Sequence, residues 1–288
     1  MQARHVLALA ALCVAPAMLP AQGGGRGGPR ADSTREAQRL DQAGEFAQSR
    51  EIFQRLIDTA PDPAAKAAAQ RRMAMSYGFE GNCAKAVEYE EMVIAYWVTR
   101  EAAEPQNAFY QEGEMANEAA RLCIDAGDID TAERMYHRGS DLGNREPEPR
   151  THPRSLWDYR LAHADARIAA RRGDAAEAKR HIALARAALD SDSAMAEGQE
   201  AYFPYLVGYV ALFTGDLPTA EAELKKSVEA LGRDPFQKCL LGMTYEKMGQ
   251  ADKAMELYRA AYEQATSHNP PSAFARRVAR EKLQGAGG

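Results

Sequence analysis

A short motif recurs six times along this chain and limits the folds that it can adopt. Each copy begins with glycine, has a small residue five positions later, and lies between two stretches of helix-forming residues. The copies are Gly44–Ser49, Gly81–Ala86, Gly127–Ala132, Gly173–Ala178, Gly215–Ala220 and Gly249–Ala254. Repetition of this kind predicts an all-α fold, an α-solenoid of six stacked helical hairpins.

Each part of the motif has a physical purpose at the turn of a hairpin. Glycine just past a helix end can adopt the left-handed conformation that satisfies the last carbonyl groups. In three copies the next residue is aspartate, which can accept hydrogen bonds from the free amides of a second helix. The small residue then lies one turn into that helix, where we expect the first helix to approach closely. The aspartates are Asp128, Asp174 and Asp216.

The residues around the last two glycines resemble the tetratricopeptide repeat, a helix–turn–helix unit of about 34 residues. Leu241, Gly242 and Tyr245 precede Gly249, and Ala254, Tyr258 and Ala261 follow it. Val207, Gly208, Ala220 and Leu224 stand in the matching places around Gly215. The resemblance is looser in the four earlier copies and covers roughly residues 30–268. It implies a curved solenoid whose concave groove is lined by the first helix of each repeat, and it implies binding to other proteins.

Insertions predict where the array is interrupted. Successive glycines lie 37, 46, 46, 42 and 34 residues apart, and the surplus falls around Thr99–Pro105, Gly143–Ser155 and Ser191–Gln199. Longer first helices are an alternative for the first and third insertions. The middle stretch is rich in proline and charge, so it cannot propagate a helix. We therefore expect repeats 1–3 at residues 31–146, a linker at 147–158, repeats 4–6 at 159–268, and a capping helix with a frayed tail at 269–288.

The N-terminal residues indicate export. Arg4 and His5 precede an apolar run from Val6 to Leu19, which Pro20-Ala21-Gln22 follows. This pattern is typical of a signal peptide at residues 1–21, and a glycine-rich spacer at residues 22–30 comes next. The run is too short for a retained membrane anchor, which needs about 20 apolar residues. Cleavage would remove one positive charge and leave a net charge of −6 in place of −5, a mild acidity that argues against general nucleic-acid binding.

Motifs that carry chemistry are missing from the sequence. It has no zinc-protease His-Glu-x-x-His, Cys-x-x-Cys pair, phosphate-binding loop or nucleophile elbow. The histidines lack metal-ligand spacing, although His163 and Asp165 stand two residues apart and could form a dyad. The run Glu88-x-Glu90-Glu91 is typical of a solvated helix face. We expect no catalytic residue, metal ion or cofactor.

The resemblance assigns candidate binding residues to the fourth and fifth repeats. Aligning the repeats places one arginine-rich stripe and one aromatic stripe on the concave groove, suited to an extended peptide with acidic and apolar side chains or a terminal carboxylate. The stripes consist of Arg160, His163, Arg167 and Arg171, and of Tyr202, Tyr205, Tyr209 and Phe213. The alternative is that the aromatic stripe packs against a neighbouring helix and that the arginines only solvate the surface. The Lys/Asn clamp of chaperone-binding members is not reproduced.

Stacking of the tetratricopeptide kind also implies a disulfide. Cys83 would begin a second helix, and Cys123 would lie near the end of the next first helix, so that the two meet. The alternative is that both are small buried residues that never oxidise, and Cys239 is expected to be a buried free thiol. The resulting hypothesis is a non-catalytic protein-interaction scaffold of the bacterial envelope, periplasmic or otherwise extracytoplasmic. The alternatives are a structural subunit of an envelope assembly, or an enzyme or ligand-binding accessory with a site near the linker.

Overall fold

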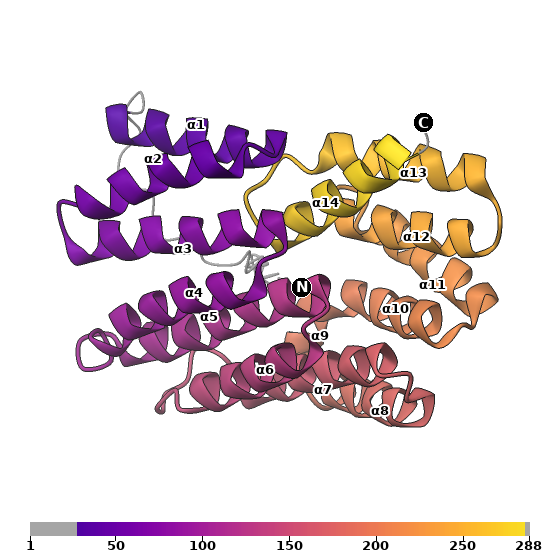
Figure 1. Cartoon of the computed structure of the whole chain (residues 1–288). Coiled ribbons are helices and arrows are strands. Elements are labelled where there is room, and N and C mark those ends of the chain that lie inside the picture. The colour runs from indigo at the N-terminus through magenta and orange to yellow at the C-terminus, as the bar shows by residue number, and fades with distance from the viewer. Residues whose placement is uncertain (1–27, 286–288) are drawn as a thin grey trace, which may run out of the picture.

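The computed structural model describes residues 28–285 and consists of paired helices (Figure 1). The signal peptide and most of the spacer predicted from the sequence therefore lie outside the described residues. The first three pairs are α1 (Pro29–Ala43) and α2 (Phe46–Asp58), α3 (Pro63–Glu80) and α4 (Cys83–Val98), and α5 (Pro105–Ala126) and α6 (Ile129–Asn144). The other three are α7 (Arg154–Arg171) and α8 (Ala175–Ser191), α10 (Phe203–Thr214) and α11 (Leu217–Ala230), and α12 (Pro235–Lys247) and α13 (Ala251–Gln264). The six expected hairpins are confirmed.

The turn of every hairpin is built as the sequence motif predicts. All six turn glycines have positive φ, between 73° at Gly249 and 93° at Gly127. Asp128, Asp174 and Asp216 each accept a hydrogen bond from the backbone amide three residues later, at 3.0–3.3 Å. The small residue of each motif is almost completely buried, with at most 2% of its surface exposed. Each turn therefore ends one helix and lets the next pack closely against it, and in these three turns the aspartate also caps the second helix.

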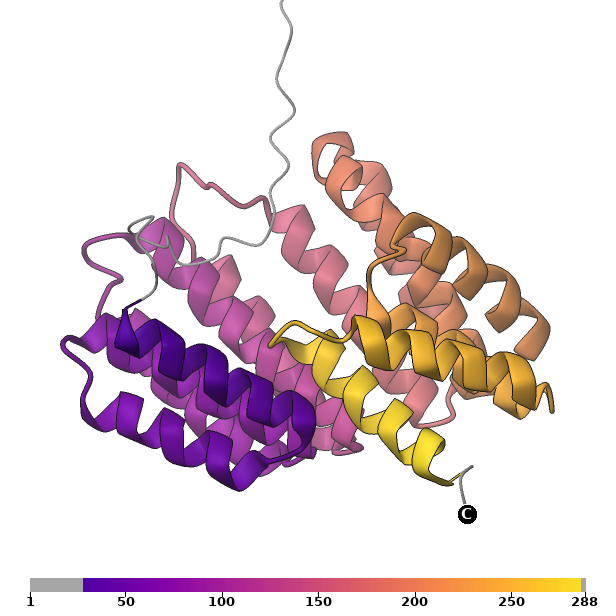
Figure 2. The ribbon, with the colours of Figure 1, turned by 90° about the horizontal axis from the view of Figure 1, so that it is seen from above.

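The pairs follow a curve, and the C-terminal helix α14 (Pro270–Gly285) lies on its inner side (Figure 2). The sequence predicts a capping helix at residues 269–288, and α14 contacts α3 and α5 as well as α12 and α13 of the last repeat. The ends of the array are also joined directly, because the Gln42 amide donates to the carbonyl of Thr266 at 2.6 Å. His268 lies 2.8 Å from the carboxylate of Asp41. The first helices of the pairs thus form the inner face, and α14 covers part of it.

The insertions take different forms. At the first insertion, a long first helix, α5 with 22 residues, takes up the extra length, and only a turn remains between α4 and α5. The third insertion forms α9 (Ser193–Gln199) and the 3₁₀ turn η1 (Glu200–Tyr202). The middle insertion is a loop that ends where α7 begins at Arg154, inside the predicted linker 147–158. Apolar packing continues across this loop, since Ile168 of α7 belongs to the same core cluster as residues of α4, α5 and α6.

Polar contacts hold the middle loop in place. The carboxylate of Glu146 accepts from the backbone amide of His152 at 3.2 Å and from the hydroxyl of Thr151 at 2.7 Å. Arg150 donates to the carbonyls of Gly143 and Glu146 at 3.1 and 2.8 Å. The loop is therefore an ordered part of the packing between repeats 3 and 4.

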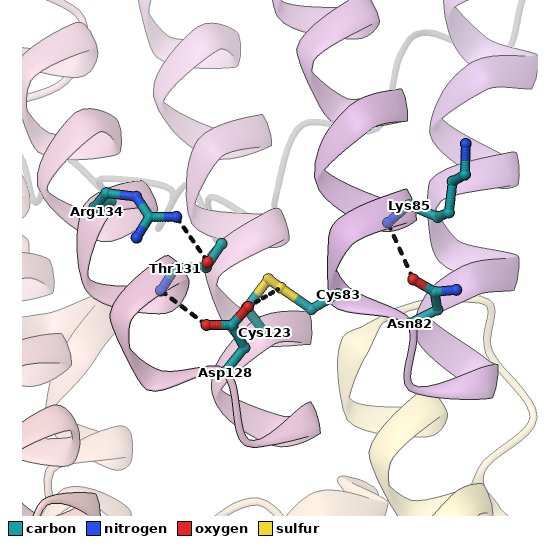
Figure 3. The surroundings of a disulfide bond; sticks show 7 residues. All are labelled: Asn82, Cys83, Lys85, Cys123, Asp128, Thr131 and Arg134. Carbon is teal, nitrogen blue, oxygen red and sulfur yellow. Dashed lines mark hydrogen bonds between the residues drawn. A yellow bond between two sulfur atoms is a disulfide. The ribbon is translucent and has the colours of Figure 1, made fainter.

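A disulfide joins Cys83, the first residue of α4, to Cys123 near the end of α5 (Figure 3). Their Cα atoms lie 4.7 Å apart, and the bond links positions 40 residues apart in the chain. A carboxylate oxygen of Asp128, the cap of α6, lies 3.5 Å from the Cys83 sulfur. The bond therefore ties repeat 2 to repeat 3, whereas Cys239 is a buried free cysteine.

Candidate functional site

The two stripes expected from the sequence lie next to each other on α7 and on η1 and α10. Arg167 of α7 donates to the hydroxyls of Tyr205, at 3.1 Å, and of Tyr136 on α6, at 2.8 Å. Arg171, one turn further along, donates to the hydroxyl of Tyr209 at 3.3 Å and to the carbonyl of Ile124 at 2.7 Å. The arginine and aromatic stripes thus bind each other and form one contact surface, named here the α7–α10 seam.

Four of the eight expected groove residues are buried within this seam. Their exposed fractions are 9% for His163, 7% for Arg167, 8% for Tyr205 and 1% for Tyr209. Burial lowers the pKa of His163 well below its ordinary value, and the positive charge of Arg167 adds to the effect. Burial likewise raises the pKa of Tyr205 and brings that of Tyr209 to about 12. These four residues hold repeats 4 and 5 together, which corrects the expectation that they face an open groove.

The other four residues remain accessible to different degrees. Tyr202 in η1 is 40% exposed and is one of the few large apolar or aromatic side chains on the described surface. Phe213 is half-buried beneath the guanidinium of Arg171, 4.8 Å from ring centre to Cζ. Arg160 forms an ion pair with Glu114 of α5 at 2.5 Å.

Asp125, at the end of α5, lies among arginines from α7 and α14. Burial raises its pKa to about 7, against the opposing charges of Arg167, Arg277 and Arg171. Arg277 of α14 donates to the backbone carbonyl of Asp125 at 2.5 Å. The C-terminal helix is therefore fixed to the inner face by a contact that also places positive charge beside the seam.

The structure does not bring catalytic groups together at the positions considered in the sequence. By their spacing in the sequence, His163 and Asp165 could form a pair. In the structure, the carboxylate of Asp165 lies 3.1 Å from His137 and 3.7 Å from His181 instead. Within residues 28–285, no three side chains of His, Cys, Asp or Glu are grouped so that they could hold a metal ion. The same part of the chain holds no helix of the length and apolar character that crossing a membrane requires.

Glu90 of α4 is a buried carboxyl group at a position where the sequence predicts an exposed one. The acidic run predicts a solvated face, but Glu90 is 0% exposed and neither carboxyl oxygen has a hydrogen-bond partner among the described residues. Burial, followed by the charge of Glu118, raises its pKa well above the ordinary value. Glu118 is paired with Arg71 of α3 at 2.6 Å. The signal in the sequence is helical spacing, because Glu90 stands four residues after Ala86 and three before Val93, both buried, whereas the exposed Glu88 is off that row.

Comparison with known families gives a match over the last hairpin. Residues 238–268, which include Gly249 and Ala254, match the family model described as tetratricopeptide repeat. The sixth hairpin is therefore similar to a tetratricopeptide repeat. This confirms the resemblance for the sixth hairpin, and the tetratricopeptide-like arrangement of the other five follows from their shared turns and stacking.

Comparison with solved structures and with curated proteins adds little. A crystal structure of the nearly identical TPR-like repeats of a putative kinesin light chain from Podosopora anserina is similar over 81% of this chain and 93% of that chain, at 18% identity and a TM-score of 0.37. The tetratricopeptide-like fold rests on the helical pairs described above. No curated protein matches the chain.

Proposed function

We propose that this protein is an exported, non-catalytic scaffold of the bacterial cell envelope that binds an extended peptide or a partner protein on its inner face. The observation that carries the proposal is the tetratricopeptide repeat at residues 238–268, within a solenoid of six such hairpins. Tetratricopeptide repeats generally mediate protein–protein interaction and are typically non-catalytic. The N-terminal sequence pattern supports export, and we propose the periplasm or another extracytoplasmic space as the location.

The inner face is suited to binding because it is rigid before a partner arrives. The hydrogen bonds of Arg167 and Arg171 fix the α7–α10 seam, and α14 braces α3, α5 and α12 from the same side. A preformed surface loses little conformational entropy on binding, so that most of this cost falls on the partner segment. Tyr202 offers a large aromatic surface that is already exposed at the end of the seam.

The middle loop offers less to a ligand than the inner face does. The Glu146 carboxylate and the Arg150 guanidinium, its main charged groups, are each occupied by several hydrogen bonds within the loop and the end of α6. His152 is stacked on Tyr110 with ring centres 3.7 Å apart. These contacts favour a structural purpose for the loop over an enzymatic or ligand-binding site near it.

Affinity capture from an envelope extract tests the proposal. The bait is the chain from residue 22 onward, and the variants are Tyr202→Ser on η1 and Leu184→Ser on α8. The two side chains are matched in exposure, at 40% and 46%, but Leu184 lies on a second helix, away from the inner face. We expect a partner that the wild type and Leu184→Ser retain and that Tyr202→Ser loses. A partner lost with Leu184→Ser alone would support the alternative of a structural subunit that uses its outer surface.

A further inference from the structure

An open cavity of about 460 Å³ lies between the N-terminal parts of α1 and α3. One wall is a stripe of α3 at helical spacing, and the other is the first turn of α1 together with a residue of α2. The apolar part of its lining is Pro29, Ala31, Leu56, Ala65, Ala68 and Ala69. The volume is in the range of natural binding sites, which combine apolar walls with a few polar groups.

Both charged side chains that line this cavity are arginines. Arg30 uses one nitrogen to donate to the carbonyl of Leu56 at 2.6 Å. Arg72 is half-buried and forms no side-chain hydrogen bond or ion pair with any residue of the described range 28–285. No aspartate or glutamate lines the cavity. The lining is therefore apolar and positively charged, which is complementary to an anionic, partly apolar occupant.

Arg72 differs in this respect from arginines near it. Its neighbour Arg71 pairs with Glu118 at 2.6 Å, and Arg50 of α2 pairs with Glu80 at 2.9 Å. Burial lowers the pKa of Arg72, and repulsion from Arg71 lowers it further. The Arg72 guanidinium has therefore lost hydration without gaining a hydrogen-bond acceptor, which costs free energy. A carboxylate offsets this cost best, because a guanidinium can bind it through two parallel hydrogen bonds.

We propose that this cavity, named here the α1–α3 pocket, binds a partner polypeptide through a segment in which Asp or Glu stands beside an apolar residue. Arg72 and Arg30 hold the side-chain carboxylate, and the alanine stripe of α3 packs against the apolar neighbour. The proposal rests on the function proposed above and adds the chemistry of the partner. It commits to a polypeptide because the two arginines complement a carboxylate, the alanines beside them complement an apolar side chain, and a peptide segment presents both groups on neighbouring residues.

The test uses an end-capped dipeptide, N-acetyl-Glu-Leu-amide, whose single charge is the side-chain carboxylate. Its matched control is N-acetyl-Gln-Leu-amide, which has the same shape and no charge. The readout is the amide NMR shifts of Ala65, Ala68 and Ala69 in the alanine-labelled chain from residue 22 onward. We expect saturable shifts with the Glu dipeptide and affinity at least about tenfold lower for the Gln dipeptide, as loss of a charge-assisted hydrogen bond implies. Equal shifts with both, or none at these residues, would overturn the proposal.

Two variants connect the binding to Arg72. Arg72→Gln breaks no side-chain hydrogen bond or ion pair within the described residues, so it should unfold near the temperature of the wild type and bind the Glu dipeptide about tenfold more weakly. Arg134→Gln removes the same charge from an exposed position on α6, where the side chain bonds only Thr131, and should bind like the wild type. Unchanged affinity of Arg72→Gln would contradict the assignment.

Further outcomes distinguish a peptide carboxylate from that of a free acid, and failure of the pocket assignment from failure of the proposed function. Hexanoate that binds the pocket more tightly than the Glu dipeptide would overturn the choice of a polypeptide in favour of a free aliphatic acid. If the wild type and Arg72→Gln capture one envelope partner equally well, the scaffold function stands and the pocket assignment fails. If the dipeptide binds through Arg72 but no partner is captured, the pocket stands and the envelope function fails.

Discussion

Arg167 of α7 and Tyr205 of α10 are hydrogen-bonded at 3.1 Å in the interior of the solenoid, where each is less than a tenth exposed. The guanidinium of Arg167 has no carboxylate within ion-pair distance among residues 28–285, and its acceptors there are two tyrosine hydroxyls and a backbone carbonyl. A buried charge of this kind is stable only while its hydrogen bonds are kept. The contact therefore makes the seam between repeats 4 and 5 a structural element more than a ligand surface.

Removal of the Tyr205 hydroxyl should destabilise the fold. Tyr205→Phe keeps the ring and its packing but leaves Arg167 short of one acceptor, which should cost about 1–3 kcal/mol of unfolding free energy. Tyr202→Phe is the control, because Tyr202 is 40% exposed and its hydroxyl has no partner within the described residues that the change would orphan. Urea unfolding monitored by circular dichroism measures both. Equal stability of the two variants would contradict a structural seam.

The disulfide between Cys83 and Cys123 should contribute to stability in the oxidised protein. It closes a loop of 40 residues, for which a cost of about 2–4 kcal/mol on removal is typical. We expect non-reducing peptide mapping to find the Cys83–Cys123 pair, and the Cys83→Ser/Cys123→Ser double variant to unfold at lower urea concentration. The thiol of Cys239 should react only after unfolding, since it is fully buried. Recovery of Cys83 and Cys123 as free thiols from the exported protein would refute the prediction.

Glu90 should make stability depend on pH. Burial and the charge of Glu118 raise its pKa in the folded protein above the unfolded value near 4.5. The folded state therefore keeps a proton that the unfolded state releases, so this group costs nothing below the unfolded pKa and destabilises increasingly as pH rises above it.

A neutral isostere at position 90 tests this. Glu90→Gln should stabilise the protein at pH 7 by about 1–3 kcal/mol, since it removes the need to bury a carboxylate. The gain should shrink toward zero as pH falls to the unfolded pKa. Thermal unfolding of both proteins across that range gives the difference directly. A gain that is the same at all pH values would show that Glu90 does not titrate as described.

Close packing of α5, α6 and α7 should make Gly143 intolerant of any side chain. A Cβ atom at Gly143 would lie 2.1 Å from the ring of Trp157, which is fully buried. Gly143→Ala should therefore cost more than about 2 kcal/mol through displaced packing. Gly198→Ala on α9 is the control, because nothing lies within 4 Å of its added Cβ, and alanine there should be neutral or slightly stabilising. Similar unfolding midpoints for the two would contradict the packing.

Local chemistry explains why the hairpins could be predicted from the sequence. A glycine that needs positive φ, an aspartate that caps the next helix and a small residue at the contact all act within a few residues of Gly127, Gly173 and Gly215. The pairing of Cys83 with Cys123 follows from the same stacking between adjacent repeats. The alignment of the repeats that the resemblance implies also assigned Arg167 and Arg171 to one first helix, α7, and Tyr205 and Tyr209 to the next, α10.

Contacts between distant segments explain what could not be predicted. The spacing of residues along the chain cannot show that Arg167 donates a hydrogen bond to Tyr205 and not to a ligand. That contact depends on how α7 and α10 pack against each other. The position of α14 on the inner face depends on closure of the whole curve, through contacts such as Gln42 with Thr266. The burial of Glu90 depends on α3 and α5, which contribute Arg71 and Glu118. The α1–α3 pocket has no sequence signature because its lining comes from three helices and includes four alanines, which are common throughout the chain.

Hydrogen–deuterium exchange of the chain from residue 22 onward, alone and with its captured envelope partner, tests the central claim most directly. Binding on the inner face predicts slower exchange in η1 and in the first helices α3, α7 and α10, with little change in the second helices α8 and α11 on the outer side. Protection confined to α8 and α11 would show that the partner binds the outer surface and would contradict the account.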